Sequence, residues 1–264
     1  MEIADDPAWM QSQEELEELA GTLTDSQIRG VLDRLATEQS CAANILGEVL
    51  VRRWATSSLA DAVLWAQHLP DTSFTHAVYK EIALAWAEKD LAGAVAWVQQ
   101  LPAGENKTAA AFSLAFEAAA QKAAVTAINL TINIPPGPER DDLLTYAAQQ
   151  WATTDTDGAV AWIKKIQDPA LRETMLGKVA VNLGVDNPFA AAELIATSMG
   201  AGQIRDNAVI NVVRFWTASA PEKTAAWVEQ FPEGELRVAA MENLFDVWNK
   251  DDPKAASVWA TTML

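Results

Sequence analysis

Few side chains in this sequence could do metal or nucleophilic chemistry. The chain has two histidines and one cysteine, so it lacks a cysteine-based zinc cage and most of the material for histidine-based triads. His68 and His76 flank a proline turn near Asp71, where a shared divalent metal is conceivable. Two histidines eight residues apart on a turn are more often polar surface residues, and we expect Cys41 to be a small buried hydrophobe. We therefore predict no metal site and no cofactor.

The acidic pair Asp141 and Asp142 is the remaining candidate for catalysis. With Arg140 it resembles the acidic motif of helical prenyl-diphosphate enzymes, in which several carboxylates on one helical face bind Mg²⁺. Leu143 and Leu144 follow, so the further carboxylate of that motif is missing. We predict that the protein is not an enzyme. The alternative is a helical-repeat or α/α-toroid hydrolase or lyase that places acids such as Asp141 and Asp142 in its concave face.

The charge balance argues against polyanionic partners. The 264 residues include 36 Asp and Glu against 19 Lys and Arg, a formal net charge of −17. Such a chain repels nucleic acids, and no apolar stretch is long enough to span a bilayer, so we predict neither nucleic-acid binding nor membrane insertion. Residues 1–7 lack the basic and apolar regions of a signal peptide. This start indicates a cytoplasmic location, with a periplasmic or secreted one as the alternative if a signal peptide was removed.

The elements of the chain are marked by its tryptophans. Ten of the eleven form pairs with members eleven residues apart: Trp54 and Trp65, Trp86 and Trp97, Trp151 and Trp162, Trp216 and Trp227, Trp248 and Trp259. The first members are 32, 65, 65 and 32 residues apart, so each long interval hides one further unit, beginning at Ala119 and Leu183. A fixed period of 32–33 residues indicates a repeat array. We expect the indoles mainly in the core, with a ligand-stacking aromatic ladder as the alternative.

Each repeat predicts two helices. The fourth residue after each first position is usually a good N-cap: Ser58, Asp90, Ala123, Asp155, Asn187, Ala220 and Asp252. A short helix A follows, and Pro or Gly residues such as Pro102, Gly104, Gly137 and Gly234 end it in a turn. Apolar residues at i, i+3, i+4 and i+7 then form the stripe of a longer helix B. We expect about sixteen helices in total.

These observations predict an all-α fold with a single domain over residues 1–264. Residues 1–21 form an acidic N-terminal cap, 22–53 a diverged repeat, 54–247 six repeats of 32–33 residues, and 248–264 a C-terminal half repeat. The half repeat has no partner helix B, which favours end-to-end self-association. A basic column, Lys107, Arg140, Arg172, Arg205 and Arg237, opens successive B helices, and we expect it to form ion pairs between adjacent repeats.

The repeats resemble the tetratricopeptide class of α-solenoids. The Asp252-Pro253 type of helix start, the alanine-rich helix A, the second helix and the period near 34 carry this resemblance, whereas the Gly and Tyr of that signature are absent. The tryptophan marking is similar to a bacterial relative of that class, and HEAT-like curvature is the alternative geometry. The resemblance implies a right-handed α/α superhelix of about seven repeats and a protein- or peptide-binding scaffold. It implies no catalytic residues.

By analogy with that class, the A helices would line the concave binding face. The second and third residues after the second Trp would then face the partner: Gln67, His68, Gln99, Gln100, Lys164, Lys165, Glu229 and Gln230. These long polar side chains suit hydrogen bonding to an extended peptide. Lys164 and Lys165 are expected to receive an acidic group of the partner. The competing interpretation is that all eight are ordinary solvated helix residues.

Overall fold

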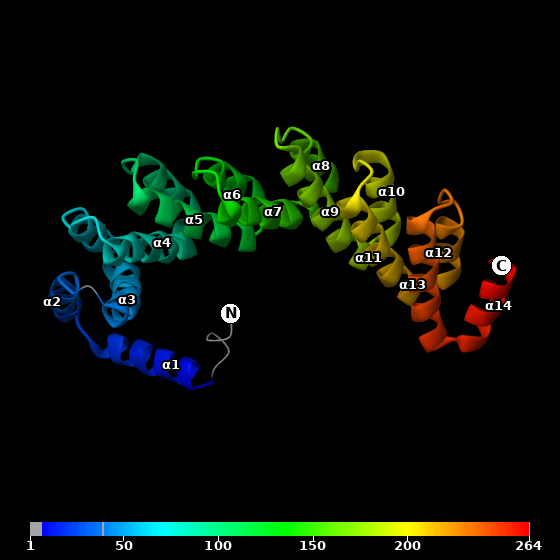
Figure 1. Ribbon diagram of the computed structural model, residues 1–264. Helices are drawn as coiled ribbons and strands as arrows, with labels where there is room; N and C mark the ends of the chain where they lie inside the picture. Colours follow the sequence, from blue (N-terminus) through cyan, green and yellow to red (C-terminus); the bar gives the residue numbers. More distant parts are fainter. Residues whose placement is uncertain (1–6, 39, 264) are drawn as a thin grey trace. The chain divides into compact units, whose positions relative to one another are not determined.

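The computed structural model describes the backbone of residues 7–38 and 40–263 and the side chains of 15–38 and 40–262 (Figure 1). Within these residues it consists of helices and turns without strands, which confirms the predicted all-α class. The helices are α1 (Pro7–Thr22), α2 (Asp25–Leu35), α3 (Cys41–Ala66), α4 (Ser73–Gln100), α5 (Glu105–Ala120), α6 (Ala124–Thr131), α7 (Pro138–Ala152), α8 (Thr156–Ile163), α9 (Pro169–Asp186), α10 (Pro188–Ser198), α11 (Gln203–Ser219), α12 (Pro221–Val228), α13 (Glu235–Asp251) and α14 (Pro253–Met263).

The chain divides into two compact units, Met1–Ala147 and Ala148–Leu264, with the boundary inside α7. In the first unit α3 packs against α4 and α4 against α5, while α1 and α2 pack on α3. In the second unit the B helices α9, α11 and α13 pack in succession, and the A helices α10 and α12 each lie against the B helices before and after them (Figure 1). In the second unit each B helix thus contacts the next B helix directly as well as the A helices beside it.

All seven predicted N-cap positions are the points where one helix ends and the next begins. Six of them have φ between −154° and −137° and ψ between 63° and 87°, and Ala123 has φ −89° and ψ 52°. Ser58 and Asp90 break α3 and α4 internally, so each of these contains a B helix followed by an A helix. With these two breaks the fourteen described helices comprise sixteen helical segments, the number that the sequence predicts.

A single residue makes each of these corners. The backbone N–H of Asp155 donates to the carbonyl oxygen of Trp151 at 2.9 Å, and the carbonyl oxygen of Asp155 accepts from Ala159 N–H at 3.1 Å. Its side-chain Oδ1 also accepts from Gly158 N–H at 2.9 Å. One residue thus closes helix B, opens helix A and caps it, so that its own N–H and C=O groups and one N–H at the start of helix A have partners.

The paired tryptophans pack across this corner. Four pairs are in ring contact, with centroid distances of 5.6 Å for Trp54 and Trp65, 5.7 Å for Trp86 and Trp97, 5.6 Å for Trp216 and Trp227, and 6.0 Å for Trp248 and Trp259. Trp54, Trp65, Trp216 and Trp248 are buried, but the other six paired indoles are half-buried. The expectation of core indoles is therefore right for four of the ten.

Cys41 is exposed, so its predicted burial is wrong, because it begins α3 at the surface.

Glycine residues shape the opposite turn, which joins helix A to the helix B that follows it. Gly104, Gly202 and Gly234 are the N-caps of α5, α11 and α13, with φ between +151° and +153°. Residues with a Cβ rarely adopt this conformation. The glycines thus start helix B, and Gly137 lacks the positive φ that they share.

The predicted ion pairs between adjacent repeats are wrong for all five members of the basic column. Within the described residues Arg140 and Arg205 pair with the aspartate that follows each in the same helix, Asp141 and Asp206, and the other three bind backbone carbonyl groups. Lys107 Nζ donates to the carbonyl oxygen of Leu101 at 3.0 Å, Arg172 Nη1 to that of Ile166 at 2.8 Å, and Arg237 Nη1 to that of Phe231 at 3.3 Å. Each spans six residues and caps the carboxyl end of its own helix A. The unsatisfied carbonyl groups at that end attract a cation, and this explains the periodic basic residue.

We expect Gly234→Ala to lower the free energy of unfolding by about 1–3 kcal/mol, since an L-residue is strained at φ +152° and ψ 179°. Gly137→Ala is the matched control, because its φ is not positive and an added Cβ meets no atom within 4 Å at either glycine. Denaturant melts of the two variants measure the difference. Equal stabilities would contradict the backbone argument.

We expect Ala220→Asp to raise the free energy of unfolding by about 1 kcal/mol. Ala220 has the corner geometry of Asp155, but its side chain makes no capping hydrogen bond. An aspartate there can accept from the free N–H groups that open α12. Thermal denaturation is the measurement, with Asp155→Ala as the reciprocal variant that should lose a similar amount; a destabilised Ala220→Asp protein would count against the cap.

Candidate functional site

The eight predicted partner-binding residues are all exposed. They lie at the carboxyl ends of A helices, with Gln67, His68, Gln99 and Gln100 in the first unit and Lys164, Lys165, Glu229 and Gln230 in the second. Two of their side chains bond to their own helices: His68 Nδ1 is 2.8 Å from the carbonyl oxygen of Leu64, and Gln230 Nε2 donates to that of Ala226 at 2.8 Å. Partner binding by these residues stays a prediction.

Glu229 has an internal role that the sequence does not reveal. Its Oε1 accepts from the indole N–H of Trp259 at 3.4 Å. In the first unit Asp33 Oδ1 accepts from the indole N–H of Trp65 at 2.8 Å. Asp33 and Glu229 hold the same register, because each is the ninth residue after the one that precedes its helix A. An acid at this position therefore links its own helix A to the second Trp of a pair, which lies on the next helix A. The self-association predicted through the half repeat that contains Trp259 stays a prediction.

A groove lies between two successive A helices in the first unit. Its volume is 460 Å³, and its lining comes from α2 and from the end of α3. The lining residues are Asp25, Ser26, Arg29, Trp54, Asp61, Leu64, Trp65 and His68. The tryptophan pair and Leu64 supply its apolar surface, and polar groups surround them. The indole Nε1 of Trp54 is buried and has no hydrogen-bond partner among the described residues.

The second unit contains a groove of 430 Å³ between α10 and α12. Its lining residues are Phe189, Ala192, Glu193, Ala196, Trp216, Lys223, Ala226, Trp227 and Gln230. Phe189 packs edge-on against Trp216, with 6.4 Å between ring centroids, and yet it is 67% exposed. An exposed phenylalanine beside two indoles is the kind of apolar surface that marks an interaction site.

The two grooves occupy the same register of the repeat. In both, the floor is the tryptophan pair of one corner, and the further wall residues correspond: Asp61 with Lys223, Leu64 with Ala226, His68 with Gln230, Ser26 with Phe189, and Arg29 with Ala192. Two of the eight predicted residues, His68 and Gln230, therefore line equivalent grooves. Phe189 escaped the sequence analysis because its repeat has no tryptophan of its own to mark it.

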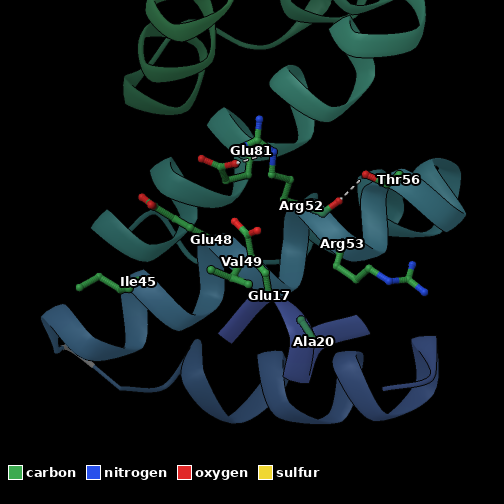
Figure 2. A pocket seen from close by; sticks show the side chains of 9 residues that line it. All are labelled: Glu17, Ala20, Ile45, Glu48, Val49, Arg52, Arg53, Thr56 and Glu81. Carbon is green, nitrogen blue, oxygen red and sulfur yellow. Dashed lines mark hydrogen bonds and ion pairs between the residues drawn. The ribbon is translucent and has the colours of Figure 1, made fainter. Parts of the chain in front are cut away.

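A third, charged pocket of 440 Å³ lies among α1, α3 and the start of α4 (Figure 2). Figure 2 shows Glu17 of α1 below Arg52 of α3, with Glu81 of α4 on the other side. Arg52 Nη2 is 2.9 Å from Glu88 Oε1, and Arg52 Nε is 4.0 Å from Glu81 Oε2. Lys80 Nζ lies 3.3 Å from Glu81 Oε1.

The register of this network recurs in the second unit. Arg214 Nε donates to Asn243 Oδ1 at 2.7 Å, between α11 and α13. Arg52 and Arg214 are both the twelfth residue after the one that precedes their own helix B. Glu81 and Asn243 are both the ninth residue after the one that precedes the next helix B. This polar contact therefore belongs to the packing of successive B helices rather than to a catalytic centre.

Burial makes Glu81 the electrostatically costly member of the network. Its side chain is 6% exposed, and burial raises its pKa above the ordinary 4.5, while Lys80 and Arg52 act in the opposite direction. For Lys80 and Arg52 burial opposes the charged form, but the neighbouring glutamates outweigh it and raise both pKa values. The three side chains stabilise one another against desolvation.

The sequence-based candidates for catalysis are not gathered into a metal site. Arg140 Nη1 contacts Asp141 Oδ1 at 3.3 Å, so this carboxylate is already paired with its neighbour. His76 Nε2 lies 2.8 Å from Asp71 Oδ1, whereas His68 bonds to its own helix. The two histidines therefore have different partners. Within the described residues there is no group of three or more metal-binding side chains. The described part of the chain also offers no helix with the length and apolar character that crossing a bilayer requires.

The raised pKa of Glu81 predicts a pH dependence of stability. Between pH 4.5 and the higher folded-state value, the folded protein holds a proton that the unfolded chain has released. The free energy of unfolding should therefore fall as the pH rises through this window. In Glu81→Gln that fall should be absent, as urea melts at a series of pH values would show; an unchanged pH profile would contradict the assignment.

Comparisons of this chain with protein-family models, curated proteins and solved structures returned no match.

Proposed function

We propose that this protein is a non-enzymatic scaffold that binds an extended segment of a protein partner along its A helices. In this proposal the repeats within each unit stack as an α-solenoid of the tetratricopeptide type, in keeping with the 32–33-residue period and the repeated helix pairs. The binding surface is the series of grooves between successive A helices, each with a tryptophan pair as its floor.

The recurrence of one groove at one register in both units is the observation that carries the proposal. Leu64 is 57% exposed and Phe189 is 67% exposed, each beside a tryptophan pair. A side chain that only fills the core is not left open to water in this way, because its burial is what stabilises the fold. Exposed apolar side chains beside a concave aromatic floor favour a partner that covers them.

Charge complementarity selects the kind of partner. The chain carries a net charge of −17, and in the first groove Asp25 and Asp61 outnumber Arg29. In the second groove Glu193 is balanced by Lys223. A segment with basic and apolar side chains satisfies both features, since successive side chains of an extended backbone point to opposite sides. Lys164 and Lys165, both exposed, remain the predicted contact for an acidic group of the partner.

The floor of the first groove also offers a polar reason for binding. The Nε1 donor of Trp54 is buried and finds no acceptor within the described residues. A buried donor without a partner costs free energy comparable to a lost hydrogen bond. A rearrangement of the groove on binding that brings a carbonyl oxygen of the bound segment to this N–H would offset the cost.

The experiment is to pan a phage-displayed random-peptide library on the protein and to measure the selected peptides by fluorescence polarisation. We expect sequences rich in basic and apolar residues. The double variant Leu64→Ser with Phe189→Ser should raise their Kd about tenfold or more, since each substitution removes an apolar contact worth about 1 kcal/mol or more.

Val238→Ser is the matched control, because Val238 is 56% exposed on α13 and lines neither groove. It should leave the Kd unchanged, and circular dichroism should show the same helix content in all variants. Failure to select any peptide, or an unchanged Kd in the folded double variant, would reject the grooves as the binding surface.

A further inference from the structure

One repeat departs from the others at the turn between its two helices. Residues 134–138 read Ile-Pro-Pro-Gly-Pro, which puts three prolines where the other turns have one at most. The turn borders a cavity of 620 Å³ in the first unit. Its lining residues are Lys80, Glu105, Thr108, Ala109, Phe112, Ser113, Ile134, Pro135, Pro136, Gly137, Pro138, Glu139 and Arg140. This cavity is separate from both grooves of the proposed function.

Arg140 behaves differently from its counterparts in the basic column. Arg172 and Arg237 each cap the carbonyl oxygen six residues earlier, at 2.8 and 3.3 Å. Arg140 instead contacts Asp141 Oδ1 through Nη1 at 3.3 Å, and its Nε is buried without a hydrogen-bond partner in the described part of the chain. Arg205 also turns to the following aspartate, but it uses its Nε to do so, at 3.3 Å. Only part of the Arg140 guanidinium is thus engaged.

The cavity presents both signs of charge around an apolar body. Lys80 already contacts Glu48 and Glu81, at 3.4 and 3.3 Å, which leaves Arg140 as the main cation for a ligand. Glu105 and Glu139 are exposed carboxylates at the same cavity, and Phe112, Ile134 and the prolines form apolar walls. A ligand with only a negative charge would be repelled by Glu105 and Glu139. A ligand with only a positive charge would leave the hydrogen-bond donors of Arg140 without an acceptor.

We propose that this cavity binds a zwitterion of the α-amino-acid class with an apolar side chain, as a free amino acid or a short free peptide. The ligand carboxylate accepts from Arg140, the ligand ammonium group faces Glu105 and Glu139, and its apolar side chain packs against Phe112 and Ile134. A guanidinium suits a carboxylate because its planar set of donors matches the two oxygens. Asp141 occupies only Nη1 of Arg140, and the terminal nitrogens rather than the buried Nε are the donors within reach of the ligand carboxylate.

Isothermal titration with four probes tests this proposal: L-leucine, the dipeptide Leu-Leu, N-acetyl-L-leucine and L-leucine amide. Saturable binding of L-leucine or Leu-Leu is expected, and the stronger of the two identifies the free amino acid or the short peptide as the ligand. The acetylated and amidated probes each lack one charge and should bind at least tenfold more weakly. No binding of any probe, or equal binding of N-acetyl-L-leucine, would overturn the proposal.

Variants then assign the binding to this cavity. Arg140→Gln should raise the Kd at least tenfold, because a hydrogen bond to a charged group is lost. Arg172→Gln is the matched control, since Arg172 holds the same register but lines no part of the cavity, and its Kd should be unchanged. If Arg140→Gln fails to fold, Glu139→Gln replaces it and should weaken L-leucine binding selectively, leaving N-acetyl-L-leucine as before. An unchanged Kd for L-leucine in the folded variant would place any binding elsewhere.

Discussion

Each repeat of this protein depends on a corner made by a single residue. Asp155 shows its construction, because its N–H closes one helix, its carbonyl opens the next and its side chain caps it. Five of the seven corners have a single residue between the helices, and three residues lie between Ala152 and Thr156. The corner residue sets the relative direction of the helices through one pair of backbone angles, which six of the seven corners share within narrow limits. At four of the corners the two tryptophans on either side are in ring contact, and this contact favours the same angle.

The grooves are a consequence of that corner. At the groove of the second unit, Trp216 lies near the end of a B helix and is buried, while Trp227 lies on an A helix and is half-buried. Successive B helices pack directly on one another, and the A helices lie against them with space between. One aromatic pair therefore stabilises the helix pair and also forms the floor of a groove in which a partner can bind.

Polar side chains have mostly structural partners in this fold. Arg172 and Arg237 cap their own A helices, and Arg52 and Arg214 reach the next B helix at one register. Because most polar side chains have such partners, a buried hydrogen-bond donor that has none stands out from the rest of the fold. The Nε1 of Trp54 and the Nε of Arg140 are two such groups in the described residues, and each belongs to a side chain that borders a concave surface.

The sequence by itself determined the helices and the points where they meet. N-cap and proline preferences act within a few residues, so positions such as Asp90 and Asn187 could be placed from spacing alone. Only the tertiary structure decided which indoles are buried, that Lys107 caps a helix instead of forming an ion pair, and that Phe189 lies open beside Trp216. The burial of the indoles and the surroundings of Phe189 depend on helices about one repeat away in sequence, whose positions a local pattern does not contain. The bond of Lys107 reaches only six residues back, but it depends on how the turn brings the carbonyl of Leu101 to the side chain.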